Sequence, residues 1–134
     1  MVEEKIGFDT GFFIKALQAD ETALNIWKKI KNNETAGYVS SLSLFEIKRL
    51  TLKGAIDKKS SEILLNDISI SCHIVWIDNM DIIDSSAKIS YSNNIPAIDS
   101  IILASLLNVG VIRIYTTDTD LQKYRKKIIS IILL

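Results

Sequence analysis

The chain has 134 residues, a length typical of one domain and sufficient to bury a core, and its 48% hydrophobic content excludes intrinsic disorder. Its 16 basic and 16 acidic residues give a net charge of zero, so no overall positive field indicates nucleic acid as a partner. One cysteine and one histidine, Cys72 and His73, are too few for a disulfide framework or a structural zinc site. We therefore expect a single domain over residues 1–134.

Targeting and membrane segments are not indicated. Residues 1–5 are charged and precede no signal-like apolar core, which predicts a cytoplasmic protein. Pro96, Asp99 and Arg113 interrupt the Ile- and Leu-rich stretch 95–115 too often for a membrane helix. The apolar end, residues 128–134, is too short to span a membrane and predicts a last buried strand or part of a dimer contact.

Short runs rich in β-branched residues predict five strands, over residues 5–8, 36–39, 73–77, 111–115 and 128–133. Helical patterns lie between them, notably after Asp9, over 22–31, over 79–92 with Asp78 as N-cap, and over 100–107. This alternation predicts an α/β fold with a parallel sheet wrapped by helices. Within it, Trp27 is interpreted as a core residue.

Four carboxylates, Asp9, Glu46, Asp99 and Asp118, recur in one setting, at or just beyond the end of a short apolar run where a helix begins. Asp9 and Asp118 would sit at strand ends, and Glu46 and Asp99 in first helical turns. The carboxyl ends of parallel strands share one edge of a sheet, and ligands bind there where the strand order reverses. Four acids from distant sequence positions are therefore expected to meet.

Such a cluster indicates a metal. Like charges a few ångströms apart disfavour ionisation unless a cation compensates them. Carboxylates without matching Lys or Arg favour a hard, oxygen-seeking ion, and Mg²⁺ or Mn²⁺ fits best.

Each acid also has a structural interpretation. Asp9 would cap the helix that follows it, and Ser43 with Glu46 matches a capping box. Asp99 would complement a helix dipole, and Asp118 would turn the chain through local hydrogen bonds. For any one residue these alternatives remain open, so the prediction of a site depends on the constellation.

The acid-bearing segments together resemble the PIN domain family, and most closely the small single-domain ribonucleases that serve as VapC-type toxins of toxin–antitoxin pairs. The resemblance covers essentially the whole chain, and its motifs are residues 7–13, 39–46, 99–105 and 116–121. It implies a three-layer fold with a central parallel, five-stranded sheet flanked by helices. Gly11 departs from the family pattern, where Asn or Ser is frequent, and so does Leu121, where an aromatic residue is usual.

By this resemblance the four catalytic acids of the family fall on Asp9, Glu46, Asp99 and Asp118. Asp9, Asp99 and Asp118 would hold the metal, with Glu46 and Asp120 as further candidates. The implied reaction is hydrolysis of RNA phosphodiester bonds, in which the metal would lower the pKa of a bound water and neutralise charge on the phosphate.

Other residues would support that reaction. Thr10 and Thr116 lie beside the acids, and the family pattern gives Thr116 the role of orienting a water. The candidate RNA-binding side chains are Lys15, Lys48, Arg49 and Lys53.

The expected partners are an RNA substrate, a second copy in a homodimer and, for a VapC-type toxin, a cognate antitoxin that blocks the acidic cleft. Two alternatives remain: a housekeeping RNA-processing nuclease and a non-catalytic PIN-like scaffold that binds RNA or protein. The presence of all four acids counts against the scaffold. A P-loop enzyme is disfavoured because the chain has no Gly-rich loop followed by Lys-Ser or Lys-Thr.

Overall fold

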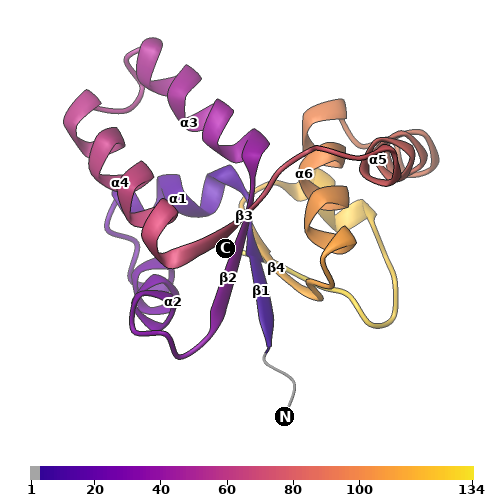
Figure 1. Ribbon diagram of the computed structural model, residues 1–134, viewed down its shortest axis with the longest axis horizontal. Coiled ribbons are helices and arrows are strands. Elements are labelled where there is room, and N and C mark those ends of the chain that lie inside the picture. Colours follow the sequence, from indigo (N-terminus) through magenta and orange to yellow (C-terminus); the bar gives the residue numbers. More distant parts are fainter. Residues whose placement is uncertain (1–3) are drawn as a thin grey trace.

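A computed structural model describes residues 4–134 as a five-stranded parallel sheet with helices on both of its faces (Figure 1). The strands are β1 (Lys5–Phe8), β2 (Ala36–Ser40), β3 (Cys72–Val75), β4 (Arg113–Thr116) and β5 (Ser130–Leu133). The helices are α1 (Thr10–Leu17), α2 (Glu21–Lys31), α3 (Ser41–Leu52), α4 (Lys58–Ser71), α5 (Met80–Asn93), α6 (Ala97–Asn108) and the short 3-10 helix η1 (Thr119–Lys123). The predicted α/β class and the five-stranded sheet are confirmed.

The strand order is β3-β2-β1-β4-β5. Strands β2 and β3 are added on one side of β1, and β4 and β5 on the other, so the strand order reverses between β1 and β4. These two strands pair in parallel, with Gly7 opposite Ile114 and Phe8 opposite Tyr115. Helices α1 to α4 lie to one side of this point in Figure 1 and α5 and α6 to the other. An edge at which connections diverge in this way is where open α/β sheets bind ligands.

Aromatic side chains fill the layer between β1 and the first helices. Phe8 lies 4.2 Å from Phe12 between ring centroids, and Phe13 lies 5.5 Å from Trp27 in an edge-to-face arrangement. All four are buried, which confirms Trp27 as a core residue. Ala23, Trp27 and Ile30 are the buried residues of α2 and lie on the face that packs against this layer, which accounts for the hydrophobic periodicity of the helix.

Several sequence-based boundaries are corrected by the structure. Helix α5 is capped by Asn79 rather than Asp78, because the Asn79 carboxamide accepts the Ile82 amide at 3.0 Å while Asp78 accepts only the Asn79 side chain. The third strand ends at Val75, two residues early. The sequence patterns do not predict helix α4. Strand β5 lies at the edge of the sheet, and none of its residues is fully buried. Among residues 4–134 no helix is long and apolar enough to cross a membrane.

Helix α6 covers the second face of the sheet, and Leu103 at its centre is fully buried. We expect Leu103→Ala to lower the free energy of unfolding by about 2–5 kcal/mol, because it removes packed methyl groups and leaves a cavity. Leu52→Ala is the control: this side chain is 90% exposed, and its loss should change stability by no more than about 0.5 kcal/mol. Urea denaturation measures both, and equal effects would contradict the assignment of α6 to the core.

Candidate acidic active site

Asp9 directly follows β1, at the carboxyl end of this strand. We call the side of the sheet where Asp9, Glu46, Asp99, Asp118 and Asp120 gather the acidic edge. Its Oδ1 accepts the Phe12 amide at 3.1 Å as the N-cap of α1, and its Oδ2 accepts a short hydrogen bond from the Thr116 hydroxyl at the end of β4. The capping interpretation is therefore correct. It does not exclude a place in the cluster, because the same carboxylate also joins two strand ends.

Glu46 lies on α3, and its capping-box interpretation is wrong. Helix α3 begins at Ser41 with Ser40 as N-cap, so Ser43 lies inside the first turn. The hydroxyl of Ser43 is buried without a hydrogen-bond partner among the residues that the structure describes. The Glu46 carboxylate instead accepts a 2.5 Å hydrogen bond from the Thr10 hydroxyl, next to Asp9 in the chain. Tertiary packing thus directs Glu46 toward the edge rather than back onto its own helix.

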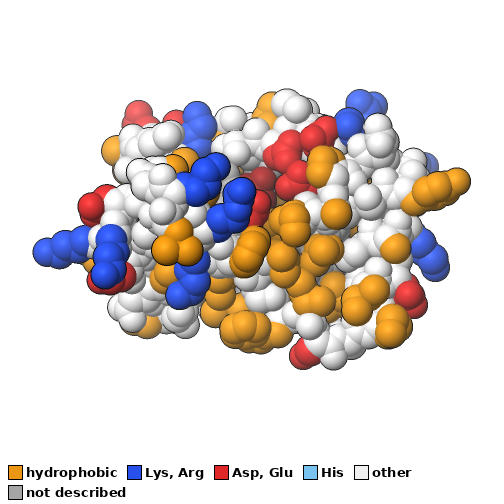
Figure 2. All heavy atoms as spheres, turned by 90° about the horizontal axis from the view of Figure 1, so that it is seen from above, with side chains coloured by type: hydrophobic (Ala, Val, Ile, Leu, Met, Phe, Trp, Pro, Cys, Tyr) orange, Lys and Arg blue, Asp and Glu red, His pale blue; other side chains and the backbone are white. Residues whose placement is uncertain are grey.

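Asp99, Asp118 and Asp120 form the tightest group, with one oxygen of each lying within 4.8 Å of the others. Asp99 occupies the first turn of α6, as predicted. Asp118 caps η1 by accepting the Asp120 amide at 2.8 Å, and its own amide donates to the Thr116 hydroxyl at 2.8 Å. Viewed down onto the strand ends, acidic side chains gather near the middle of the molecule (Figure 2).

This donor set fits a hard divalent cation. Three carboxylate oxygens converge, all three residues are partly exposed, and oxygen is the ligand atom that Mg²⁺ and Mn²⁺ prefer. The four predicted acids lie close enough for their charges to affect one another, but Asp120, rather than Asp9, groups most closely with Asp99 and Asp118. Asp9 is only 6% exposed, and both of its oxygens already accept hydrogen bonds.

The acids disturb each other's ionisation. Burial raises the pKa of Asp9 from 3.8 to about 6, with smaller contributions from the charges of Asp118 and Glu46, while its hydrogen bonds from Thr116 and Phe12 oppose the rise. Burial, followed by the adjacent Asp118 carboxylate, raises the pKa of Asp99 to about 7. A bound cation would reverse both shifts, because it favours the charged form.

The loop after β4 explains one departure from the family pattern. A side-chain carbon at Gly11 would collide with the hydroxyl of Thr117. Thr117 thus fills the space that an Asn or Ser side chain would need, in the same loop that carries Thr116 and Asp118. No signal in the sequence links Gly11 to Thr117, since the two residues lie far apart in the chain.

The candidate RNA-binding side chains lie on α1 and α3. Lys48, Arg49 and Lys53 are exposed on or at the end of α3, and Lys15 is half-buried in the last turn of α1. Basic side chains gather beside the acids in Figure 2, on the side built by α1 to α4. Their role in RNA binding stays a prediction. Lys123 belongs to a basic run of the sequence, but its pairing with an acid of the cluster was not predicted: its amine lies 2.7 Å from the Asp120 carboxylate. Its spacing of three residues from Asp120 was the available signal.

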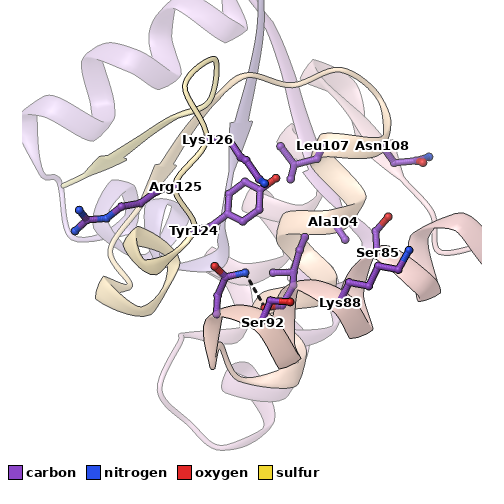
Figure 3. A pocket seen from close by; sticks show the side chains of 11 residues that line it. Ser85, Lys88, Ser92, Ala104, Leu107, Asn108, Tyr124, Arg125 and Lys126 are labelled. Carbon is purple, nitrogen blue, oxygen red and sulfur yellow. Dashed lines mark hydrogen bonds between the residues drawn. The ribbon is translucent and has the colours of Figure 1, made fainter.

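Two hollows flank the pair α5 and α6, and neither includes an acid of the cluster. One, of about 440 Å³, lies between these helices and the segment after η1, with Tyr124, Lys88 and Lys126 in its lining (Figure 3). The other, of about 470 Å³, is almost entirely apolar and includes Ile83, Tyr91 and Ile101. The acids of the cluster therefore lie outside both of these hollows.

The family profile of the PIN domain matches residues 6–127, and the chain belongs to that family. A comparison with curated protein sequences found no match. The fold is similar to that of a chain in the VapBC2 complex of Rickettsia felis bound to a promoter DNA fragment, with a TM-score of 0.76, 12% identity and coverage of 97% of this chain and 98% of that one.

Two further solved structures share the fold. A chain in the DNA-bound VapBC of Salmonella typhimurium has a TM-score of 0.65 at 16% identity, and the match covers 96% of each of the two chains. A chain in FitAcB of Neisseria gonorrhoeae has a TM-score of 0.64 at 15% identity, with coverage of 95% of this chain and 96% of that one. At these identities the likeness shows the fold.

The raised pKa values of Asp9 and Asp99 predict how the stability of the metal-free protein depends on pH. Because the folded state holds these protons more tightly than the unfolded chain, stability should fall as pH rises from about 4 to about 7. Asp99→Asn removes one of the two groups, so its loss of stability between pH 5 and pH 8, in EDTA, should be smaller than that of the wild type. Asp78→Asn, at an exposed position outside the cluster, should follow the wild type. Identical slopes for all three proteins in urea denaturation would contradict the prediction.

Proposed function

We propose that the chain is a metal-dependent endoribonuclease that hydrolyses phosphodiester bonds in single-stranded or loop RNA. The observation that carries this proposal is the convergence of Asp9, Glu46, Asp99 and Asp118 at the strand-order reversal of a PIN domain. Asp99 and Asp118 would hold Mg²⁺ or Mn²⁺, with Asp9 and Asp120 as further ligands. When bound, such an ion neutralises charge on the phosphate and lowers the pKa of a water.

The remaining polar residues have positioning roles in this proposal. Thr116 donates to Asp9 and accepts from the Asp118 amide, so one buried hydroxyl fixes the relative positions of two proposed ligands. Thr10 donates to Glu46 and so aims this carboxylate toward the edge, where it would orient a water or complete a second cation site. Lys48, Arg49, Lys53 and Lys15 would contact the phosphates of the RNA.

Within this activity we assign the chain to the toxin of a VapBC-type pair, with a cognate antitoxin as its partner in the cytoplasm. Support comes from the whole-chain similarity to chains of two VapBC complexes. The main alternative is a housekeeping RNA-processing nuclease with the same site. An antitoxin gene beside that of this chain would favour the toxin, and its absence would favour processing.

The nuclease proposal is tested by cleavage of a mixed single-stranded RNA pool with Mg²⁺, Mn²⁺ or EDTA. We expect metal-dependent cutting that falls at least roughly 100-fold in Asp9→Asn and in Asp118→Asn, because each removes a charge that the reaction needs while keeping the shape of the side chain. Asp78→Asn is the matched control, since it changes an exposed acid outside the cluster and should retain full activity. Cutting that survives both site variants would place the reaction elsewhere. The absence of cutting by well-folded, partner-free protein would favour the non-catalytic scaffold.

We also propose that the chain forms a homodimer through the apolar face of α5. Tyr91 is 92% exposed, Met80 64% and Ile83 52%, and Ile83 and Tyr91 border the apolar hollow between α5 and α6. Exposed apolar side chains that adjoin an apolar hollow are uncommon on a monomer and are typical of a surface that another chain covers. A second copy would cover it with the same residues around a two-fold axis.

Light scattering coupled to size exclusion tests the dimer. The wild type should elute at twice the 15.0 kDa mass of one chain, and Ile83→Arg should elute as a monomer because it would bury an unpaired charge in the contact. Leu52→Arg, which adds the same charge at a 90% exposed position on α3, should leave the dimer intact. A monomeric wild type, or a dimer in the Ile83 variant, would contradict this surface.

A further inference from the structure

Lys123 is the cation in direct contact with the acidic cluster. Within residues 4–134, the ion pair between its amine and Asp120 Oδ1, at 2.7 Å, is the one salt bridge that involves Asp9, Glu46, Asp99, Asp118 or Asp120. The pair is partly hydrated, with side-chain exposures of 44% for Lys123 and 36% for Asp120. It engages Oδ1 of Asp120, the same residue that offers an oxygen to the group formed with Asp99 and Asp118.

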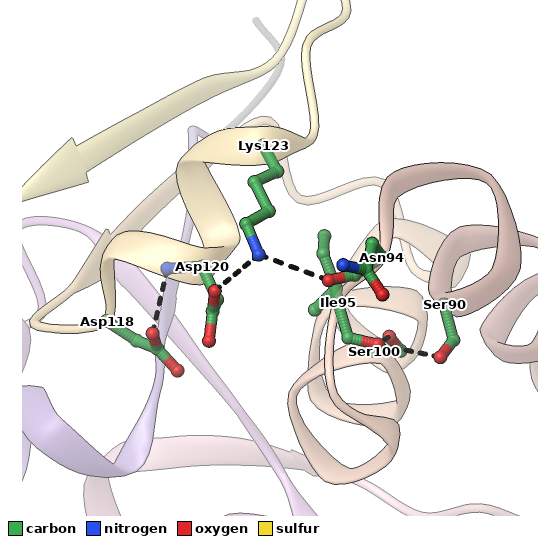
Figure 4. A network of polar contacts seen from close by, with 7 residues as sticks. All are labelled: Ser90, Asn94, Ile95, Ser100, Asp118, Asp120 and Lys123. Atoms are coloured by element: carbon green, nitrogen blue, oxygen red, sulfur yellow. Dashed lines mark hydrogen bonds and ion pairs between the residues drawn. The ribbon is translucent and has the colours of Figure 1, made fainter.

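The amine has a second, independent anchor. Lys123 also donates to the backbone carbonyl of Asn94 at 3.1 Å, so it connects η1 to the turn between α5 and α6 (Figure 4). That turn is itself fixed, because Ser90 and Ser100 both donate their hydroxyls to the Ile95 carbonyl, at 2.7 and 3.2 Å. The ammonium group therefore keeps a partner beside the cluster even when Asp120 turns away from it.

A divalent cation at this cluster meets Lys123 as a competitor. An ion bound to Asp120 would share this carboxylate with Lys123. The positive charges of the ion and of the Lys123 amine would then repel each other. Lys123 is thus placed to weaken cation binding, in contrast to an uncharged neighbour that would only orient a ligand.

We propose, on the basis of the function proposed for this site, that Lys123 is a built-in counter-cation that competes with the divalent ion for Asp120. This competition sets the metal concentration at which the site fills. In the metal-free protein it compensates part of the negative charge of the cluster. When the metal binds, Lys123 remains at the Asn94 carbonyl and yields Asp120 to the ion.

Calorimetric titration of the metal-free protein with Mn²⁺ tests this proposal without an activity assay. Lys123→Met should bind Mn²⁺ about fivefold more tightly, an effect in the range expected for removal of one charge a few ångströms away in a partly hydrated site. Lys123→Arg keeps the charge and should bind like the wild type. Lys126→Met makes the same charge change three residues further on, where no ion pair is formed within residues 4–134, and should shift the affinity less than twofold.

A double-mutant cycle assigns the effect to Asp120. If Lys123 acts mainly through this carboxylate, Lys123→Met should have a clearly smaller effect on Mn²⁺ affinity in an Asp120→Asn background than in the wild type, with only the repulsion from the anchored charge left. Unchanged or weaker binding by Lys123→Met, or an equal gain in Lys126→Met, would overturn the counter-cation while leaving the proposed metal site intact. Absence of Mn²⁺ binding by the folded wild type would overturn the metal site itself and the counter-cation with it.

Discussion

The parallel pairing of β1 with β4 is the contact on which the acidic edge depends. The two strands are remote in the sequence, yet the Asp9 amide donates to the Tyr115 carbonyl at 3.2 Å, and the ladder ends with the Thr116 hydroxyl on the Asp9 carboxylate. Strand β2 extends the sheet on one side of β1, and β5 extends it beyond β4. Helices α1 to α4 lie to one side of this β1–β4 pair and α5 and α6 to the other. The edge between them stays open, and α3, α6 and η1 each bring an acid to it.

An aromatic layer adjoins Asp9 in the chain and in the fold. Phe8 precedes Asp9, its ring lies 4.2 Å from that of Phe12, and Tyr115 stacks against Phe8 with ring centroids 6.1 Å apart. Burial is the main cause of the raised pKa of Asp9. The same carboxylate also caps α1, so one residue contributes to folding through its hydrogen bonds and opposes folding through its charge.

Five carboxylates within one small edge are stable only with compensation, and the chain supplies it in three ways. Backbone amides and threonine hydroxyls donate to the acids, proton uptake neutralises those with raised pKa values, and Lys123 provides a positive charge at Asp120. Each of these responses is weaker than a divalent cation at the same place. This difference in compensation supports the proposal that an ion completes the site, and the proposed nuclease activity rests on that ion.

The sequence by itself determined the five strands to within two residues, the start of α1 after Asp9 and the four candidate acids, because periodicity and strand-end acids are local patterns. The PIN family followed from the resemblance of its motifs. Tertiary structure alone decided that Glu46 meets Thr10 instead of Ser43 and that Thr117 fills the space beside Gly11. It also joined Lys123 to the Asn94 carbonyl. The physical reason is distance along the chain. A local pattern shows which groups can donate or accept, but the partner of each group is set by strand order and helix packing, which bring distant residues together.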